Sequence, residues 1–460
     1  MKLIISANRL PVTVKKNAVG QFDYKRIDGG LVTGIDSLRS SMDFAWFGNI
    51  SSSLTEEEKT RISSDLIKTY QSHPVFIDPE LNSLCYDGFC NSILWPALHS
   101  FPDNVCFTFK EYDAYKKYNR IFAEKIAAVM DEDDIVWIHD YHQMLVPRYL
   151  KELKPHVKIL FFSHTAFCEP ENLDRLLCAR DLLNSLSLCD VVGFHTPEYA
   201  SNFSLSLDSY KIGRIPKIKA ISIGIEPGMF RSCLEKEETK AAIRRLRKCY
   251  KNKRIILGVD RADYIKGMPQ RFKGIERFYQ RNKKAVSEVV FLQISIPSRL
   301  GVQEYAGYVE QINRQIEHIN STMGRMEDTP IQMLFHGVTF IELCALYSIA
   351  DAILITSVVD GMNLVAMEYV ACQDENEGTV ILSEHTGATV TLQGVFVHDS
   401  NNTESIAEAV EMSLNLTKEQ RKINHETNRK AIDAFNSIGW ASESLDCVSE
   451  SWRGEIFKKQ

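Results

Sequence analysis

The chain has 460 residues, of which 44% are hydrophobic and 25% are charged, a composition typical of a soluble globular protein with more than one domain. The net charge of −6 excludes a strongly basic surface, so we expect neither nucleic acid nor a membrane as a partner. The apolar runs are shorter than the roughly 18 residues of a membrane helix. The 11 cysteines are scattered and follow no secretory leader, which favours reduced thiols in a cytoplasmic enzyme.

Short apolar segments alternate with amphipathic segments from the first residues onward. Most of the apolar segments carry hydrophobic residues on both faces, which is typical of strands in a parallel sheet covered by helices. The predicted strands are Lys2–Ala7, Asp134–Asp140, Lys158–His164, Asp190–His195, Lys217–Ile225, Arg254–Asp260, Val289–Pro297, Ile331–His336, Asp351–Ser357 and Thr379–Ser383. Apolar residues at helical spacing predict helices over Ala114–Met130, Glu237–Lys251, Pro269–Asn282 and Tyr305–Met323.

The alternation of strands and helices predicts an α/β protein. About ten strands exceed what one compact sheet usually holds, so we expect two doubly wound, Rossmann-like domains. A Pro-Gly turn at residues 227–228 marks the boundary and predicts domains over residues 1–225 and 226–435. We expect residues 436–460 to form a last helix that packs back on the first domain.

Two segments of the first domain are candidates for ligand binding. Arg9 follows the first strand, and Gly29 and Gly30 open the next helix, where backbone N–H groups suit a phosphate. A plain turn beside a surface arginine would give the same residues. The segment from Tyr86 to Pro96 mixes aromatic and small polar residues without a helical period, which favours a binding loop.

Histidines and an aspartate follow two central strands of the first domain. His139, Asp140 and His142 come directly after the apolar strand residues Ile135–Ile138, and His164 ends the next strand. Ligands of open α/β sheets bind at the carboxyl ends of strands. No zinc-like spacing accompanies these residues, so we expect polar groups that contact sugar hydroxyls rather than a metal site.

Cations follow two strands of the second domain. Arg261 and Lys266 lie on the loop after one strand, and Arg299 follows the next. A surface salt bridge to Asp263 is one interpretation of this loop. A clamp on a diphosphate is the other, because arginine supplies a bidentate fork and lysine a compact charge.

A third loop of the second domain runs from Asp360 to Glu368. Asp360 and Gly361 form a turn after an apolar strand, and a helix begins at once with free N–H groups that suit an anion. Glu368 lies about two turns along that helix, where a carboxylate can bind ribose hydroxyls. A solvent-facing glutamate is the alternative.

Taken in order, these blocks resemble the trehalose-6-phosphate synthases of glycosyltransferase family 20. The matching blocks are NRLPV, GGL, YDGFCNSILWP, HDYH, FFSH, SIGIEP, GVDRADYIKGMPQRF, PSR, DGMNLVAMEYVACQDE and ILSE. The resemblance runs from about residue 2 to beyond residue 430. It implies a GT-B fold, with two Rossmann-like domains facing a central cleft, and retaining transfer of glucose from UDP-glucose to glucose 6-phosphate. The N-terminal domain would take the acceptor and the C-terminal domain the nucleotide sugar.

The resemblance also implies roles for individual residues. Acceptor-binding positions are matched by Arg9, Tyr86, Trp95, Asp140 and Arg299. Donor-binding positions are matched by Gly29, Gly30, His164, Arg261, Lys266, Asp360, Met362, Asn363, Leu364, Val365 and Glu368. Among these, the residues nearest the chemistry would be Asp140, His164, Arg261, Lys266 and Asp360. Arg9 and Arg299 would grip one acceptor phosphate across the cleft.

Several positions depart from the family's pattern. Asn49 replaces an aromatic residue near the acceptor, Val359 replaces an arginine and Met367 a lysine. The departure at Asn49 leaves open a sister transferase that uses another phosphorylated acceptor, such as glycerol 3-phosphate. A silent subunit that senses nucleotide sugars is a further alternative.

The remaining expectations concern cofactors and partners. We expect no cofactor and no metal requirement, because Arg261 and Lys266 supply the positive charge at the diphosphate. No phosphatase-like segment is recognisable in the sequence, so release of trehalose would need a separate trehalose-phosphate phosphatase. The sequence leaves open a complex with that enzyme or a homo-oligomer.

Overall fold

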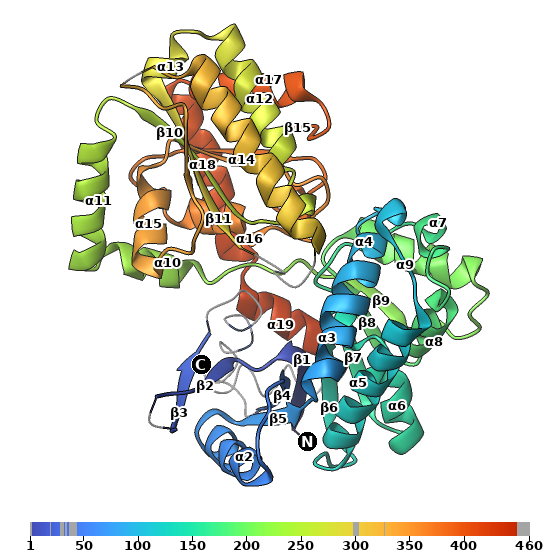
Figure 1. Cartoon of the computed structure of the whole chain (residues 1–460). Coiled ribbons are helices and arrows are strands. Elements are labelled where there is room, and N and C mark those ends of the chain that lie inside the picture. The colour runs from blue at the N-terminus through green and yellow to red at the C-terminus, as the bar shows by residue number, and fades with distance from the viewer. Residues whose placement is uncertain are drawn as a thin grey trace. The chain divides into compact units, whose positions relative to one another are not determined.

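The computed structural model describes residues 2–18, 20–27, 32, 35, 44–297, 303–325 and 327–448. The chain forms two compact units (Figure 1). Unit 1 comprises Met1–Ile223 with Ser437–Gln460, and unit 2 comprises residues 224–436. The sequence placed these divisions at residues 225 and 435. No helix in the part of the chain that the structure describes is long and apolar enough to cross a bilayer.

Unit 1 is built on a parallel sheet in which seven strands are described. In sheet order they are β5 (Ser72–Phe76), β4 (Phe44–Ile50), β1 (Leu3–Arg9), β6 (Ile135–His139), β7 (Lys158–Phe162), β8 (Val191–Phe194) and β9 (Lys217–Ala220). The chain runs outward from β1 to β4 and β5, then returns to the other side of β1 with β6. The strand order therefore reverses between β1 and β6, and the carboxyl ends of such neighbours are where open α/β sheets bind ligands.

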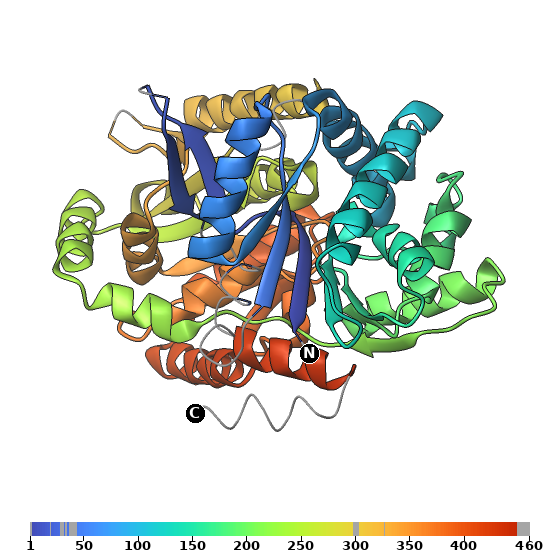
Figure 2. The ribbon, with the colours of Figure 1, turned by 90° about the horizontal axis from the view of Figure 1, so that it is seen from below.

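Helices and one hairpin surround this sheet. The helical segments of unit 1 are α2 (Glu56–Tyr70), α3 (Pro79–Ser83), η2 (Leu84–Leu94), α4 (Trp95–Leu98), η3 (Pro102–Asn104), α5 (Phe109–Ala127), η4 (Tyr141–Gln143), α6 (Val146–Leu153), α7 (Pro170–Leu173), α8 (Ala179–Ser187), α9 (Pro197–Ser209) and α19 (Ser437–Asp446). The hairpin consists of β2 (Val12–Lys16) and β3 (Phe22–Arg26). The last helix, α19, lies against the sheet of unit 1 (Figures 1 and 2). The ring centroids of Trp440 on α19 and Trp137 on β6 are 4.9 Å apart.

Unit 2 is a second parallel sheet with six described strands. In sheet order they are β12 (Ile331–Leu334), β11 (Val289–Ile296), β10 (Arg254–Arg261), β13 (Ala352–Ile355), β14 (Thr379–Ser383) and β15 (Val395–His398). The order reverses between β10 and β13, which pair through Ile256 and Leu257. The loops after β10 and β13 therefore meet at the ligand-binding position of this sheet.

Two helical layers cover this sheet. One contains α12 (Met268–Arg281), α14 (Gln303–Met323) and α17 (Thr403–Leu414), and the other α10 (Pro227–Leu234), α11 (Glu237–Cys249), α15 (Phe340–Ile349), α16 (Leu364–Ala371) and α18 (Lys418–Ala434). The short segments are η5 (Tyr264–Lys266), α13 (Ala285–Glu288) and η6 (Gly387–Val390). Phe272 and Ile275 of α12 pack with Ile312 of α14 and Ile406 of α17 in the core between this first layer and the sheet.

The predicted α/β architecture with two doubly wound sheets is confirmed. The strands β2, β3, β4, β5 and β15 were not predicted, and two of them contain a residue that is uncommon in strands. Pro74 in β5 has no N–H for a sheet ladder and is tolerated because β5 is an edge strand. Gly48 in β4 is required by space, because a Cβ there would lie 2.4 Å from the Leu10 backbone nitrogen. Proline and glycine are both uncommon in strands, so the sequences of β4 and β5 did not indicate strands.

Candidate active site

Lys266 and Asp360 form an ion pair at the reversal point of unit 2. Lys266 ends η5, directly after β10, and Asp360 lies on the loop after β13. The ammonium Nζ and the carboxylate Oδ2 are 2.6 Å apart, and each side chain is 12% exposed. The pairing partner of Lys266 is thus the other predicted donor residue, rather than Asp263. Arg261, the last residue of β10, is exposed beside this loop.

The Asp360 carboxylate is held ionised by its neighbours. Its Oδ2 also accepts hydrogen bonds from the Ser357 hydroxyl at 3.1 Å and the Asn363 amide at 3.0 Å. Burial opposes ionisation, but the attraction of Lys266 and these hydrogen bonds outweigh it and hold the pKa of Asp360 below its usual value. A fixed, charged acceptor of this kind suits the hydroxyl groups of a sugar.

The start of α16 lies immediately after this carboxylate. Asn363 adopts a left-handed conformation with φ of 69°, and its side chain caps the helix by accepting from the Ala366 N–H at 3.3 Å. Met362 is buried, whereas Leu364 and Val365 are half-buried. The first turn of α16 therefore presents backbone N–H groups beside the ion pair, as the sequence predicts for an anion site.

Glu368 lies one turn further along α16. Its carboxylate accepts a hydrogen bond from the buried Tyr347 hydroxyl at 3.0 Å. Burial raises the pKa of Glu368, although the Tyr347 hydrogen bond opposes that shift. Glu368 is thus a partly buried, oriented carboxyl, which does not fit the interpretation of a solvent-facing helical residue. Nothing in the sequence near Tyr347 indicated its part in orienting Glu368.

Unit 1 places Arg9 and Tyr86 in one pocket. The guanidinium Nη2 of Arg9 donates to the Tyr86 hydroxyl at 2.9 Å, and the Trp46 indole N–H holds the Arg9 carbonyl at 2.9 Å. The pocket has a volume of about 420 Å³ and is lined by Asn49 and Asn82 as well. A cation, a phenol and two amides that line one pocket suit a phosphorylated polyol.

The segment that contains Tyr86 is a π-helix, η2, and not the loop that we predicted. A π-helix has i→i+5 hydrogen bonds, so its buried side chains do not recur at the spacing of an α-helix, and π-helical turns are frequent at functional sites. Tyr86 stacks on His142, with ring centroids 5.6 Å apart and planes 11° apart. Trp95 follows η2 but is buried, 4.0 Å from His99 between ring centroids, and does not line the pocket of Arg9 and Tyr86.

Asp140 and His164 are joined where β6 and β7 end. The Asp140 carboxylate accepts the His164 backbone N–H at 3.1 Å. Asp140 has a φ of 73°, a strained value for a residue other than glycine that occurs preferentially at functional sites. The sequence predicted that both residues would lie at strand ends, and the structure places them in direct contact.

Burial lowers the pKa of two histidines in unit 1, His139 and His164, and so favours their neutral forms. His139 Nδ1 and His164 Nε2 are 3.1 Å apart. Burial lowers the pKa of His139 from 6.5 to about 3, and burial together with His195 and His139 holds the pKa of His164 well below 6.5. The ring of Trp440 on α19 covers both, 6.2 Å from His139 and 5.7 Å from His164 between centroids. The contribution of Trp440 was not predicted, because it is distant in sequence.

Three predicted site residues, Gly29, Gly30 and Arg299, lie outside the described residues.

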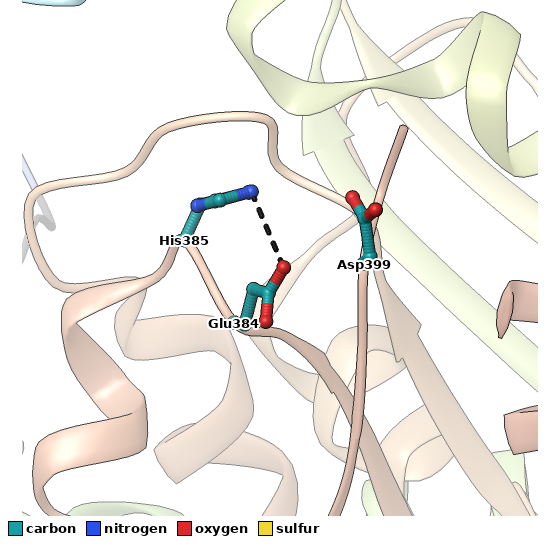
Figure 3. A group of neighbouring side chains, drawn as sticks. All are labelled: Glu384, His385 and Asp399. Atoms are coloured by element: carbon teal, nitrogen blue, oxygen red, sulfur yellow. Dashed lines mark ion pairs between the residues drawn. The ribbon is translucent and has the colours of Figure 1, made fainter. Parts of the chain in front are cut away.

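One group in unit 2 has the composition of a metal site. Possible ligand atoms of Glu384, His385 and Asp399 lie within 4.8 Å of one another (Figure 3). His385 pairs with Glu384 at 3.6 Å, and its carbonyl accepts the Asp360 N–H at 3.0 Å. Glu384 and His385 are exposed and Asp399 is half-buried, as is common for surface carboxylates without an ion, so we assign no metal to this group.

Comparison with known proteins agrees with this geometry. Residues 1–450 match glycosyltransferase family 20. The chain is 46% identical over 458 residues to an alpha,alpha-trehalose-phosphate synthase (UDP-forming) of Encephalitozoon cuniculi, covering 99% of this chain and 100% of that protein.

Two solved structures are similar over nearly the whole chain. One is an alpha,alpha-trehalose-phosphate synthase (UDP-forming) from Burkholderia xenovorans in complex with glucose-6-phosphate, with 25% identity, a TM-score of 0.86, and coverage of 99% of this chain and 100% of that chain. The other, from E. coli, is bound with UDP-2-fluoro glucose, with 26% identity, a TM-score of 0.87, and coverage of 100% and 99%. The chain therefore has the GT-B fold and belongs to glycosyltransferase family 20.

Proposed function

We propose that this protein is a retaining glucosyltransferase that moves glucose from UDP-glucose to glucose 6-phosphate and forms trehalose 6-phosphate and UDP. Family membership supports this reaction, and relatives are bound with glucose-6-phosphate and with UDP-2-fluoro glucose. The single observation that carries the proposal is the ion pair of Lys266 with Asp360 beside the start of α16.

Unit 2 supplies the groups for departure of the nucleotide. When the glycosidic bond of UDP-glucose breaks, negative charge grows on the diphosphate. Lys266, Arg261 and the N–H groups of α16 stabilise that charge, and such preorganised groups are most effective where they need not reorganise. Asp360 accepts from the hydroxyls of the donor glucose, and Glu368 binds the ribose.

Unit 1 supplies the groups for the acceptor. Arg9 binds the phosphate of glucose 6-phosphate. The Tyr86 hydroxyl donates to or accepts from the sugar hydroxyls, and the Asp140 carboxylate accepts from them. His164 is neutral and therefore serves as a hydrogen-bonding group for the transferred glucose rather than as a cation. In a retaining reaction on one face of the donor, the leaving phosphate oxygen takes the proton of the attacking hydroxyl.

The proposal extends to cofactors and partners. Arg261 and Lys266 provide the charge that a divalent cation provides in other sugar-nucleotide enzymes, so transfer needs no metal. The product keeps its phosphate and is therefore a substrate for a trehalose-phosphate phosphatase. Association with that enzyme or between copies of this chain is part of the proposal.

An acceptor screen tests the proposed function. UDP release from UDP-glucose is measured with glucose 6-phosphate, glucose and glycerol 3-phosphate, with Lys266→Ala as the inactive control. We expect release with glucose 6-phosphate alone and trehalose 6-phosphate as the product. Release with glycerol 3-phosphate instead would assign the pocket around Asn49 to another acceptor. UDP binding without release for any acceptor would identify a sensing subunit.

A further inference from the structure

A fully buried arginine lies behind the donor site of unit 2. Arg271, on α12, has a side chain that is 1% exposed, and its ion-pair partner Asp260 is 2% exposed. Removing two charges from water is costly, and replacing a buried ion pair by apolar residues of similar volume is often neutral or stabilising. In addition, the Arg271 Nη2 has no hydrogen-bond partner among the described residues. Stability alone therefore does not explain this charge.

The partners of Arg271 come from three neighbouring strands. Its Nη1 donates to Asp260 of β10 at 2.5 Å and to Gln293 of β11 at 2.6 Å, and its Nε donates to the Thr356 hydroxyl, directly after β13, at 3.0 Å. Glycine at position 258 leaves room for these hydrogen bonds, because a Cβ there would lie 2.7 Å from Arg271 Nη1 and 2.3 Å from the Gln293 side-chain oxygen. Arg271 thus ties together the strands that flank the reversal point.

Hydrogen bonds of the Thr356 hydroxyl connect Arg271 to the loop that carries Lys266. A guanidinium can only donate, so the Thr356 oxygen must accept from Arg271. The single hydroxyl proton of Thr356 is then shared between the carbonyl oxygens of Lys266 and Gly267, which lie 3.2 Å and 3.1 Å from Oγ1. Gly267 closes the turn with a φ of 61°, and a Cβ there would lie 2.0 Å from the Thr356 carbonyl oxygen.

These hydrogen bonds link Arg271, through Thr356, to the backbone of Lys266, the residue that carries the ammonium group. The Val358 N–H donates to the Ile265 carbonyl at 2.8 Å, so the two loops are joined at Val358 as well as at Thr356. Lys266 on one loop then reaches Asp360 on the other.

We propose that Arg271 is a positioning residue for glucosyl transfer, which acts through the Thr356 hydroxyl to fix the backbone of Lys266 and aim its ammonium at the leaving diphosphate. This inference rests on the proposed function. Arg271 is neutralised by Asp260 and does not need to touch the substrate. A misplacement of about 1 Å at a catalytic group can cost on the order of 10²-fold in rate, so a small shift of the loop has a large effect.

Thr356→Val tests the inference, because it removes the hydroxyl and keeps the shape. We expect kcat and kcat/KM to fall together by roughly 10- to 100-fold, because a displaced Lys266 ammonium stabilises the transition state less well. Thr356→Ser keeps the hydroxyl and should restore turnover. Arg271→Met should show the same kinetic loss as Thr356→Val, and it provides a second measurement should either variant fold poorly.

A matched control separates positioning from general packing. Tyr279→Phe removes a buried hydroxyl from the same helix, whose partners are the carbonyls of Val289 and Pro330 at 3.0 Å and 3.2 Å. Val289 is the first residue of β11, at the opposite end of the strand from the donor site. Tyr279→Phe should lower the melting temperature and leave kcat unchanged.

The decisive measurement is a double-mutant cycle with Lys266→Ala. If Thr356 acts through Lys266, Thr356→Val costs little further activity once Lys266 is alanine. Equal losses in both backgrounds, or an equal loss for Tyr279→Phe, would overturn the inference. The same cycle on UDP affinity, measured by calorimetry, needs no turnover. Coupling of Thr356 and Lys266 in UDP binding would therefore support the inference even if the wild type transferred no glucose and the proposed function failed.

Discussion

The carboxyl ends of the two sheets hold the same topological position but different kinds of side chain. In unit 1 the carboxyl ends of β6 and β7 carry His139, the last residue of β6, and His164, just after β7; burial keeps both neutral, and aromatic rings surround them. In unit 2 the residues after β10 and β13 include the charged pair of Lys266 and Asp360. Sheet topology determines where a ligand binds, and the residues that follow each strand determine which ligand.

Under the proposed function, the two units bind different parts of the substrates. Neutral imidazoles and stacked rings suit uncharged sugar hydroxyls and faces, with Arg9 as the cation for a phosphate. Fixed charges suit a leaving group on which charge develops. Variants that alter the residues of one unit at a time should therefore have different effects.

The largest effect is expected from loss of the charge in unit 2. Lys266→Ala should lower kcat by roughly 10²- to 10³-fold, because one preorganised group at the developing charge is lost. It also leaves Asp360 buried without its cation, so the melting temperature should fall. Adding Asp360→Asn should restore the melting temperature but not turnover. Lys273→Ala, on the exposed face of α12, is the control and should change neither. Unchanged turnover in folded Lys266→Ala would contradict the assignment.

A smaller effect is expected from loss of the cation in unit 1. Arg9→Ala should raise the KM for glucose 6-phosphate by about 10- to 100-fold, since a charge-assisted hydrogen bond contributes about 1.5–3 kcal/mol. UDP affinity, measured by calorimetry, should stay near the wild-type value. Arg9→Lys keeps the positive charge but loses the bidentate guanidinium, so its KM for glucose 6-phosphate should lie between those of the wild type and Arg9→Ala. A variant that lost UDP affinity and kept acceptor affinity would show that Arg9 serves the donor.

The neutral histidines predict a dependence of stability on pH. The pKa of His139 is about 3 in the folded protein and 6.5 ordinarily, so the unfolded state binds more protons as the pH falls below 6.5. The free energy of unfolding should therefore decrease on acidification, by about 2 kcal/mol at pH 5 through this residue alone. Urea unfolding at pH 8 and pH 5 measures the slope, and His139→Gln should flatten it. An identical slope in the variant would mean that His139 is already protonated in the fold.

The smallest expected effect is that of chelation. Because Lys266 and Arg261 carry the positive charge, EDTA should leave UDP release unchanged, and magnesium should not increase it. The double variant Glu384→Gln with Asp399→Asn removes both carboxylates of the group in Figure 3 and should also leave UDP release unchanged. Activity that depended on added magnesium and was lost in this double variant would assign a cation to that group.

The central strands of both sheets were predictable because their sequences are apolar on both faces. The five residues of β6, for example, are all buried. Because such strands end in polar loops, the residues at the reversal points, such as Arg261 and Asp140, were predictable as well. Topology brings those loops together without any further information from the local sequence.

The residues that were missed act through distant partners. Arg271 lies in a helix with Arg277 and Arg281, which pair with exposed glutamates, and the sequence does not distinguish the buried arginine from the exposed ones. Tyr347 and Glu368 are 21 residues apart and meet only through the packing of α15 and α16. Such contacts depend on tertiary structure, which local patterns do not encode.

The return of α19 to unit 1 has a consequence for synthesis on the ribosome. Unit 1 contains residues 1–223 and also 437–460, so the chain of unit 2 is complete before that of unit 1. At about 5–20 residues per second, the 214 residues from 223 to 437 take on the order of 10–40 s to translate. During that time the rings of His139 and His164 lack the cover of Trp440. The domain that comes first in the sequence is therefore the later of the two to be fully synthesised, and chaperones that act on nascent chains would meet it without its last helix.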